Sequence, residues 1–208
     1  RRHTRYISVT GVQTCALPIY LDSRARAAVI SCKRFQSRCS SGTIESDYDN
    51  MSNIFIGDSV TDCDRIAIPP YGHGWVNEIA KSGRITNVIN VGTSGHRLVD
   101  LDMRWQADVL DNKPERLTIN IGINDTWRRY DDNDPTSVED FAARYDRLIS
   151  ETLKEFKVDL VLCEPFLLHV RPEMATWRED LDPKIAVVHD LTKKYQAKLV
   201  KFDEMFTQ

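Results

Sequence analysis

The chain has 208 residues, of which 28% are charged, and its formal net charge is −3. Residues 1–50 hold eight Lys or Arg against four Asp or Glu, a charge of +4, so residues 51–208 carry −7. An acidic main part argues against binding to nucleic acid or to an anionic membrane surface, and no apolar run reaches the roughly 18 residues of a membrane span. We therefore expect a small-molecule partner, no nucleic acid and no membrane.

The first fifty residues differ from the rest. The opening RRHTRYISVTGVQTCALPIY (1–20) has no hydrophobic period and resembles the conceptual translation of a sequencing adapter. Met51 then begins MSNIFIGDS, which is typical of a cytoplasmic enzyme whose chain starts directly on its first strand. We expect residues 1–50 to be a non-native or disordered head and residues 51–208 to be the functional domain. A basic tail with a role of its own is the alternative.

The five cysteines do not form a recognisable framework. Three lie in the head and two in the main part, and none has metal-ligand spacing (Cys15, Cys32, Cys39, Cys63 and Cys163). An odd count of this kind predicts neither a disulfide scaffold nor a zinc site, and favours a reducing, cytoplasmic compartment. No metal and no organic cofactor is implied.

From Met51 onward, short apolar runs alternate with longer amphipathic ones, which is the pattern of repeated βα units. This pattern predicts an α/β fold of three layers, α/β/α, around a five-stranded parallel sheet of flavodoxin-like order. In such sheets ligands bind beyond the carboxyl ends of the strands. Thr136 and Glu139 have the spacing of a capping box before the third helix. The predicted strands are 53–57, 86–91, 116–122, 158–164 and 198–203, and the predicted helices are 73–82, 97–112, 137–157 and 182–196.

Polar residues follow the first three predicted strands. GDSVTDCDR (57–65) places Ser59 at a strand-to-helix turn, NVGTSGHR (90–97) holds Gly92 and Gly95, and GINDTWRRY (122–130) begins with Asn124 and Asp125. Singly, these are a helix cap, turn glycines and a turn dipeptide. Together they bring to one edge a nucleophile and three oxyanion donors: the amide of Asn124 and the backbone N–H groups of Ser59 and Gly95. The glycines would let the backbone approach a ligand closely.

GDSVTD, GTSG and GIND resemble the first three sequence blocks of the SGNH hydrolases, also called GDSL-type esterases. The resemblance extends over nearly all of residues 51–208 and is to the subgroup that contains bacterial acetylxylan esterases and small lysophospholipase-like esterases. The resemblance implies that Ser59 is the nucleophile, that Gly95 and Asn124 complete the oxyanion hole, and that Asp58 holds the Ser59 turn through backbone hydrogen bonds. It also implies that Trp127, Arg128 and Tyr130 line the mouth of the pocket, with a solvated loop as the alternative for Arg128 and Arg129.

The family's catalytic base is missing from the printed sequence. It is a histidine in a D-x-x-H segment after the last strand, oriented by the aspartate, whereas this chain ends at KFDEMFTQ. We expect a truncated, C-terminally incomplete domain with its D-x-x-H segment encoded beyond Gln208. His169 is the least unfavourable substitute among the histidines present. His73 and His96 are expected to be loop or cap residues, and His189 to have a surface or packing role.

The sequence thus predicts a hydrolase of short acyl esters, deacetylating a carbohydrate or cleaving another short ester through an acyl-enzyme. The main alternative is a non-catalytic module that binds acylated ligands because its base is lost. A weaker alternative is a phosphatase-like α/β domain in which Asp58 and Asp125 hold Mg²⁺.

Overall fold

The computed structural model describes residues 52–168 and 170–206, so the expectations for residues 1–50 and for His169 lie outside the described part. Its centre is a five-stranded parallel sheet with the order β2-β1-β3-β4-β5. This confirms the predicted α/β fold and its flavodoxin-like strand order. The strands are β1 (Ser52–Gly57), β2 (Val88–Gly92), β3 (Pro114–Asn120), β4 (Asp159–Cys163) and β5 (Lys198–Val200).

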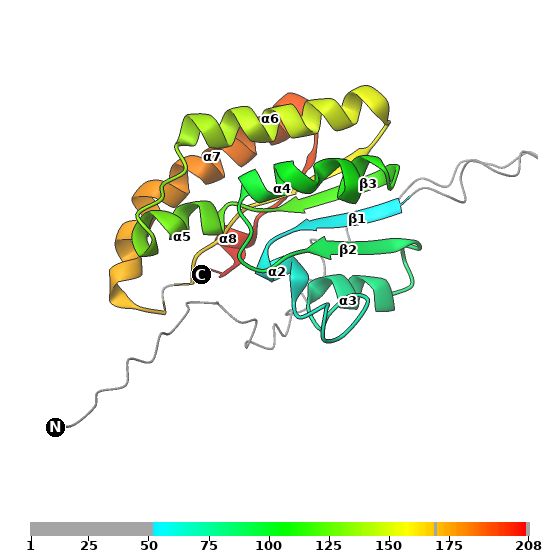
Figure 1. Cartoon of the computed structure of the whole chain (residues 1–208), viewed down its shortest axis with the longest axis horizontal. Coiled ribbons are helices and arrows are strands. Elements are labelled where there is room, and N and C mark those ends of the chain that lie inside the picture. The colour runs from blue at the N-terminus through cyan, green and yellow to red at the C-terminus, as the bar shows by residue number, and fades with distance from the viewer. Residues whose placement is uncertain (1–51, 169, 207–208) are drawn as a thin grey trace, which may run out of the picture.

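Helices cover both faces of the sheet, as the apolar residues of the strands require (Figure 1). The helical elements are α2 (Ser59–Asp62), α3 (Trp75–Lys81), α4 (Leu98–Trp105), the π-helical η1 (Gln106–Leu110), α5 (Ile123–Asp131), α6 (Val138–Glu155), the 3-10 helix η2 (Pro172–Trp177), α7 (Arg178–Tyr195) and α8 (Phe202–Phe206).

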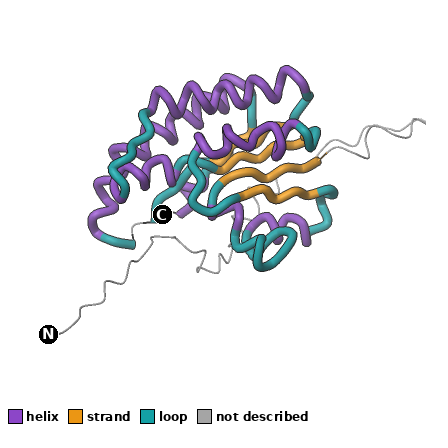
Figure 2. The backbone as a smooth tube through the Cα atoms, viewed as in Figure 1, coloured by secondary structure: helices purple, strands orange, loops and turns teal. Residues whose placement is uncertain are grey.

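Alternate residues of β1 face opposite layers, as expected for a strand buried on both sides. Ile54 and Ile56 lie in the main core with residues of α4, α6 and α7, whereas Phe55 packs with Trp75 of α3 on the other face. Figure 2 shows the strands enclosed between these helices. No helix among the described residues is long and apolar enough to cross a membrane.

The end of the last strand differs from the prediction because a side chain distant in sequence sets it. β5 ends at Val200 rather than at residue 203, because Phe202 begins α8. The buried carboxylate of Glu164 accepts the backbone N–H groups of Asp203 and Glu204 at 3.1 and 3.4 Å, which caps the first turn of that helix.

Two further predictions need correction at helix starts. α6 is capped by Ser137, whose Oγ accepts the N–H of Asp140 at 3.0 Å, so the expected capping box of Thr136 and Glu139 is wrong by one residue. The segment after β3, expected as a loop, is the helix α5. Its Ile123 and Trp127 pack against Trp177 and neighbouring residues, and this burial favours a helix over a turn.

Candidate active site

The carboxyl ends of the strands form one level row. Gly57 of β1 pairs in register with Gly92 of β2 and with Asn120 of β3, and Asn120 pairs with Cys163 of β4. The chain leaves this row into α2, into the loop before α4, and into α5. The three predicted segments therefore start from the same edge of the sheet, as the fold class requires.

Ser59 is the first residue of α2, directly after the strand-to-helix turn. Asp58 is the N-cap, and its Oδ1 accepts the N–H of Val60 at 2.9 Å. The indole Nε1–H of Trp75 donates to the carbonyl of Val60 at 2.9 Å and fixes the same turn from the α3 side. Asp58 thus holds the Ser59 turn through a backbone hydrogen bond, as expected.

Gly57 and Gly92 allow α2 to lie directly on the sheet. A β-carbon on Gly92 would stand 2.3 Å from the backbone nitrogen of Asp62, and one on Gly57 would stand 2.6 Å from Oγ1 of Thr61. The N–H of Gly92 donates to Oδ1 of Asn90 at 2.9 Å. The expectation that Gly92 brings its N–H to a ligand is therefore wrong: this glycine makes room for α2.

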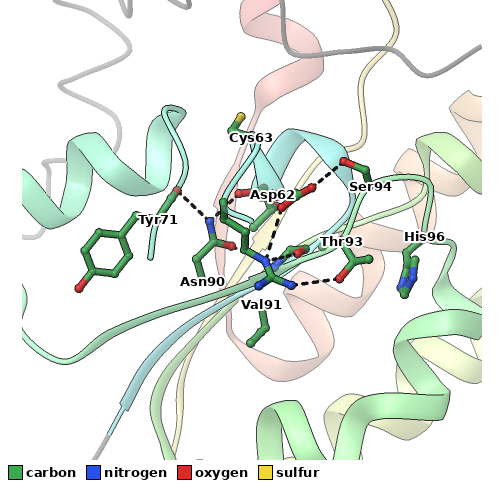
Figure 3. A network of polar contacts seen from close by, with 12 residues as sticks. Asp62, Cys63, Tyr71, Asn90, Val91, Thr93, Ser94 and His96 are labelled. Carbon is green, nitrogen blue, oxygen red and sulfur yellow. Dashed lines mark hydrogen bonds and ion pairs between the residues drawn. The ribbon is translucent and has the colours of Figure 1, made fainter. Parts of the chain in front are cut away.

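A polar network joins α2 to the loop that follows β2 (Figure 3). The hydroxyl of Ser94 donates to Oδ2 of Asp62 at 2.7 Å. Arg65 donates from Nε to the carbonyl of Gly92 at 2.6 Å and from Nη2 to Oγ1 of Thr93 at 3.5 Å. These contacts fix the residue before Gly95 relative to the helix that begins at Ser59. Sequence reasoning did not single out Asp62 or Arg65, although both lie in the quoted segment GDSVTDCDR.

Gly95 is exposed and adopts a φ of +82°, a conformation that favours glycine. Asn124 lies in the first turn of α5, and its Nδ2 donates to the carbonyl of His96 at 2.9 Å. Since a side-chain amide has two N–H groups, this bond orients Asn124 and leaves the second N–H for another acceptor. The contact also brings the two predicted oxyanion donors, Gly95 and Asn124, onto adjoining segments.

The ring of His96 faces Arg104 of α4. Nε of Arg104 donates to Nδ1 of His96 at 3.2 Å, so Nδ1 is the acceptor and the proton of the neutral ring is on Nε2. Burial, and then the charge of Arg104, lower the pKa of His96. Arg104 also donates to the carbonyls of Val91 and Gly57 at 2.7 and 3.3 Å, which ties this histidine to the ends of β1 and β2.

The other described histidines contact acidic side chains. Nδ1 of His73 lies 3.7 Å from Oδ2 of Asp64, in a loop position as expected. Nε2 of His189 lies 2.5 Å from Oε1 of Glu164, the residue that follows β4. His189, expected to have a surface or packing role, thus also links α7 to the strand ends through Glu164.

Two buried carboxyls stand next to the predicted catalytic residues. Burial, opposed by the hydrogen bond from Val60 and reinforced by the nearby charge of Asp125, raises the pKa of Asp58 to about 7. Burial, opposed mainly by the hydrogen bond from the N–H of Leu98, raises the pKa of Asp125 to about 6. Each carboxyl adjoins a predicted catalytic residue in the chain, because Asp58 precedes Ser59 and Asp125 follows Asn124. Among the described residues, no group of His, Cys, Asp and Glu could hold a metal ion.

These carboxyls should make the fold less stable as the pH rises. Because both pKa values exceed the unfolded value of 3.8, the native state holds more protons from about pH 4 to about pH 7 at Asp58 and to about pH 6 at Asp125. The free energy of unfolding should fall there by about 1 kcal/mol per pH unit for each carboxyl. Asn at position 58 can keep the cap without titrating, so Asp58→Asn should show a shallower fall in urea unfolding at several pH values. The lowered pKa of His96 makes its own contribution to stability rise with pH, but this contribution is the same in the wild type and the variant. The difference between their free energies of unfolding therefore reports on Asp58. Parallel plots of that free energy against pH would contradict the role given to Asp58.

The aromatic residues after Asn124 belong to an apolar cluster. Trp127 is 8% exposed and meets Trp177 edge-on, with ring centroids 4.9 Å apart. Tyr130 stacks on the same indole at 4.8 Å. Arg129 pairs with Glu179 and Asp180 of α7 at 3.4 and 3.2 Å. Trp127, Tyr130 and Arg129 thus hold α5 against η2 and α7, and a place at a pocket mouth stays a prediction for Trp127 and Tyr130.

Known proteins similar to this chain include an acetylxylan esterase. An acetylxylan esterase of Geobacillus stearothermophilus is 29% identical over 171 residues, which cover 74% of this chain and 77% of the esterase. Its solved structure superposes with a TM-score of 0.63 at 29% identity, covering 76% of this chain and 80% of the other. An uncharacterized lipoprotein of Bacillus subtilis (strain 168) is 32% identical over 101 residues, 47% of this chain and 41% of the lipoprotein.

A family model matches nearly the whole described domain. The matched residues are 55–208, and they include the end of β1, all three loops of the site and every later strand. The chain therefore belongs to the GDSL-like Lipase/Acylhydrolase family, the ester-bond hydrolases that the sequence blocks predicted.

Proposed function

We propose that this chain is a serine esterase that removes short acyl groups, in particular acetyl groups from a carbohydrate, through an acyl-enzyme on Ser59. One observation carries the proposal. A continuous set of contacts joins the helix of Ser59 to Ser94, next to Gly95, and joins His96 to Asn124, so nucleophile and oxyanion donors stand on one connected frame. The likeness to an acetylxylan esterase supports an acetylated carbohydrate as the substrate.

In the proposed reaction, Oγ of Ser59 bonds to the ester carbonyl carbon while a histidine takes the hydroxyl proton. The N–H groups of Ser59 and Gly95 and the amide of Asn124 donate to the oxyanion that forms. The histidine then returns the proton to the departing alcohol, and water releases the acyl group by the same steps in reverse order. No metal or organic cofactor takes part.

We propose that the base comes from a D-x-x-H segment encoded beyond Gln208. Solved structures of the acetylxylan esterase include catalytic mutants in which a serine, an aspartate and a histidine are each replaced by alanine. The last two residues are three positions apart in that enzyme, which is the D-x-x-H spacing. The described histidines of this chain instead contact Arg104, Asp64 and Glu164. A cytoplasmic location stays a prediction, since one relative is named a lipoprotein.

The experiment compares hydrolysis of 4-nitrophenyl acetate by the 208-residue chain and by the chain continued through the downstream D-x-x-H segment. We expect the longer protein to be faster by roughly 10³-fold or more, because loss of a triad member leaves only oxyanion stabilisation and binding. Alanine in place of the new histidine should return the rate to that of the shorter chain. Equal rates for both lengths, or a gene without such a segment, would contradict the proposal and favour a module that binds acylated ligands.

A further inference from the structure

Arg128 occupies a position that the reaction scheme above does not use. It follows Asn124 by four residues on α5, so both side chains project from the same face of the helix, one turn apart. Its side chain is 28% exposed. A cation therefore stands beside the amide that is proposed to stabilise the oxyanion.

The two terminal nitrogens of the Arg128 guanidinium have different surroundings: Nη1 is held by carboxylates, and Nη2 lies towards Gly95. Nη1 lies 2.6 Å from Oδ2 of Asp131 and 3.3 Å from Oδ2 of Asp132. Nη2 lies 3.9 Å from the point where a β-carbon on Gly95 would stand. Apart from the chain neighbours of Gly95, no other heavy atom of the described residues comes within 4 Å of that point. Arg128 is thus the side chain that borders the open space above Gly95.

The local charges indicate which ligands this donor would accept. One guanidinium faces two carboxylates, so Arg128, Asp131 and Asp132 together carry a net negative charge. Such a group would repel an anionic substrate, while its N–H donors can still bond neutral oxygen atoms. An apolar alcohol would leave these donors without acceptors, which costs free energy where water is displaced.

The adjacent Arg129 provides a contrast within the same helix. Its guanidinium reaches Glu179 and Asp180 of α7, so it links two packed helices. The partners of Arg128 are instead on its own α5 or directly after it, at i+3 and i+4. Surface pairs at this spacing contribute little to stability. Stability therefore does not account for a guanidinium held over Gly95.

We propose that Arg128 is a substrate-binding residue whose Nη2 donates to a hydroxyl or ring oxygen of a neutral, hydroxyl-rich alcohol, so that the site selects esters of carbohydrates over esters of apolar alcohols. The proposal rests on the proposed function, because it assigns the alcohol side of the ester to the space beside Gly95 and Asn124. It adds a recognition element that lies on the same rigid helix as one oxyanion donor.

The test is a titration of the ¹⁵N-labelled chain with methyl β-xylopyranoside, and separately with 1-butanol, followed through the backbone N–H of Gly95 and the Nε–H of Arg128. The glycoside should shift both signals, and Arg128→Met should weaken its binding by about tenfold, the effect of losing one hydrogen bond to a charged donor. Arg128→Lys should recover part of the affinity, since Lys keeps a donor but not the planar fork. Arg129→Met, the matched control, should bind like the wild type.

Binding of the free alcohol requires neither Ser59 nor a histidine, so this result is independent of turnover. Loss of glycoside binding in Arg128→Met, together with no ester hydrolysis by the chain continued through a D-x-x-H segment, would support the role of Arg128 and contradict the proposed function. Ester hydrolysis by that longer chain, together with unchanged glycoside binding in Arg128→Met, would support the proposed function and contradict the role of Arg128. Equal weakening for the glycoside and 1-butanol, or no binding of the glycoside by the wild type, would overturn the role of Arg128.

Discussion

Replacing Ser59 by alanine in the chain continued through the proposed D-x-x-H segment is expected to lower kcat for 4-nitrophenyl acetate by roughly 10⁴-fold or more. The substitution removes the atom that bonds to the carbonyl carbon, while the oxyanion donors on Gly95 and Asn124 remain. The measurement is a steady-state rate at saturating substrate, at equal concentrations of folded protein.

The fold should survive this change, because the cap of α2 uses the carboxylate of Asp58 and the N–H of Val60 rather than the Ser59 hydroxyl. Thermal unfolding of the variant should therefore resemble that of the wild type. Ser82→Ala is the matched control: it deletes another serine hydroxyl at a helix end, bonded to the carbonyl of Ile79, away from the site. A Ser59→Ala variant that keeps wild-type kcat would rule out Ser59 as the nucleophile.

Replacing Gly92 by alanine is expected to destabilise the domain strongly. The new β-carbon would stand 2.3 Å from the nitrogen and 2.8 Å from Cα of Asp62, and these are backbone atoms that no rotamer change can move. Either β2 or α2 must shift. We expect the free energy of unfolding to fall by about 3 kcal/mol or more, in the upper range of overpacking effects.

Gly83→Ala provides the control for this prediction. Gly83 has a φ of +64°, so alanine is strained there, yet nothing lies within 4 Å of the new β-carbon. Gly83→Ala should lower the free energy of unfolding by about 1 kcal/mol, the effect of a non-glycine residue in the left-handed region. Urea unfolding of both variants makes the comparison. Equal losses of stability would mean that α2 does not depend on its close approach to Gly92.

Gly92→Ala should also impair catalysis in the part of the protein that remains folded. The shift would act on Asp62, whose carboxylate holds Ser94, and so on the spacing between Ser59 and Gly95. A displacement of about 1 Å at a catalytic group can cost on the order of 100-fold in rate. The structural role of this glycine and the geometry of the site therefore come from the same contact.

The strand order and the positions of Ser59 and Asn124 could be predicted because local pattern determines them. Apolar runs of strand length alternating with amphipathic segments leave few topologies, and the loops at the carboxyl edge follow from the topology. The start of α5 could not be predicted in this way. The Asn-Asp pair is typical of turns, and the helix there depends on packing of Trp127 against Trp177, which is distant in sequence.

The same limit applies to the contacts that hold the site together. Asp62 and Ser94 meet only once β1 and β2 lie side by side, and Arg104 meets His96 only once α4 has formed beside the loop that precedes it. Neither pair has a local sequence signal that marks it. The end of β5 was mispredicted for the same reason, because the carboxylate that caps α8 belongs to Glu164, after another strand. Sequence pattern thus pointed to the proposed reactive groups, while tertiary contacts supplied the groups that position them.

The central claim is that Ser59 carries the acyl group. It is tested most directly by mixing the protein with 4-nitrophenyl acetate, stopping the reaction with acid, and analysing the peptides by mass spectrometry. We predict an added acetyl group on the peptide that contains Ser59, absent in Ser59→Ala and present in Ser82→Ala. Acetylation confined to another residue, or rapid hydrolysis that continues in Ser59→Ala, would contradict the account.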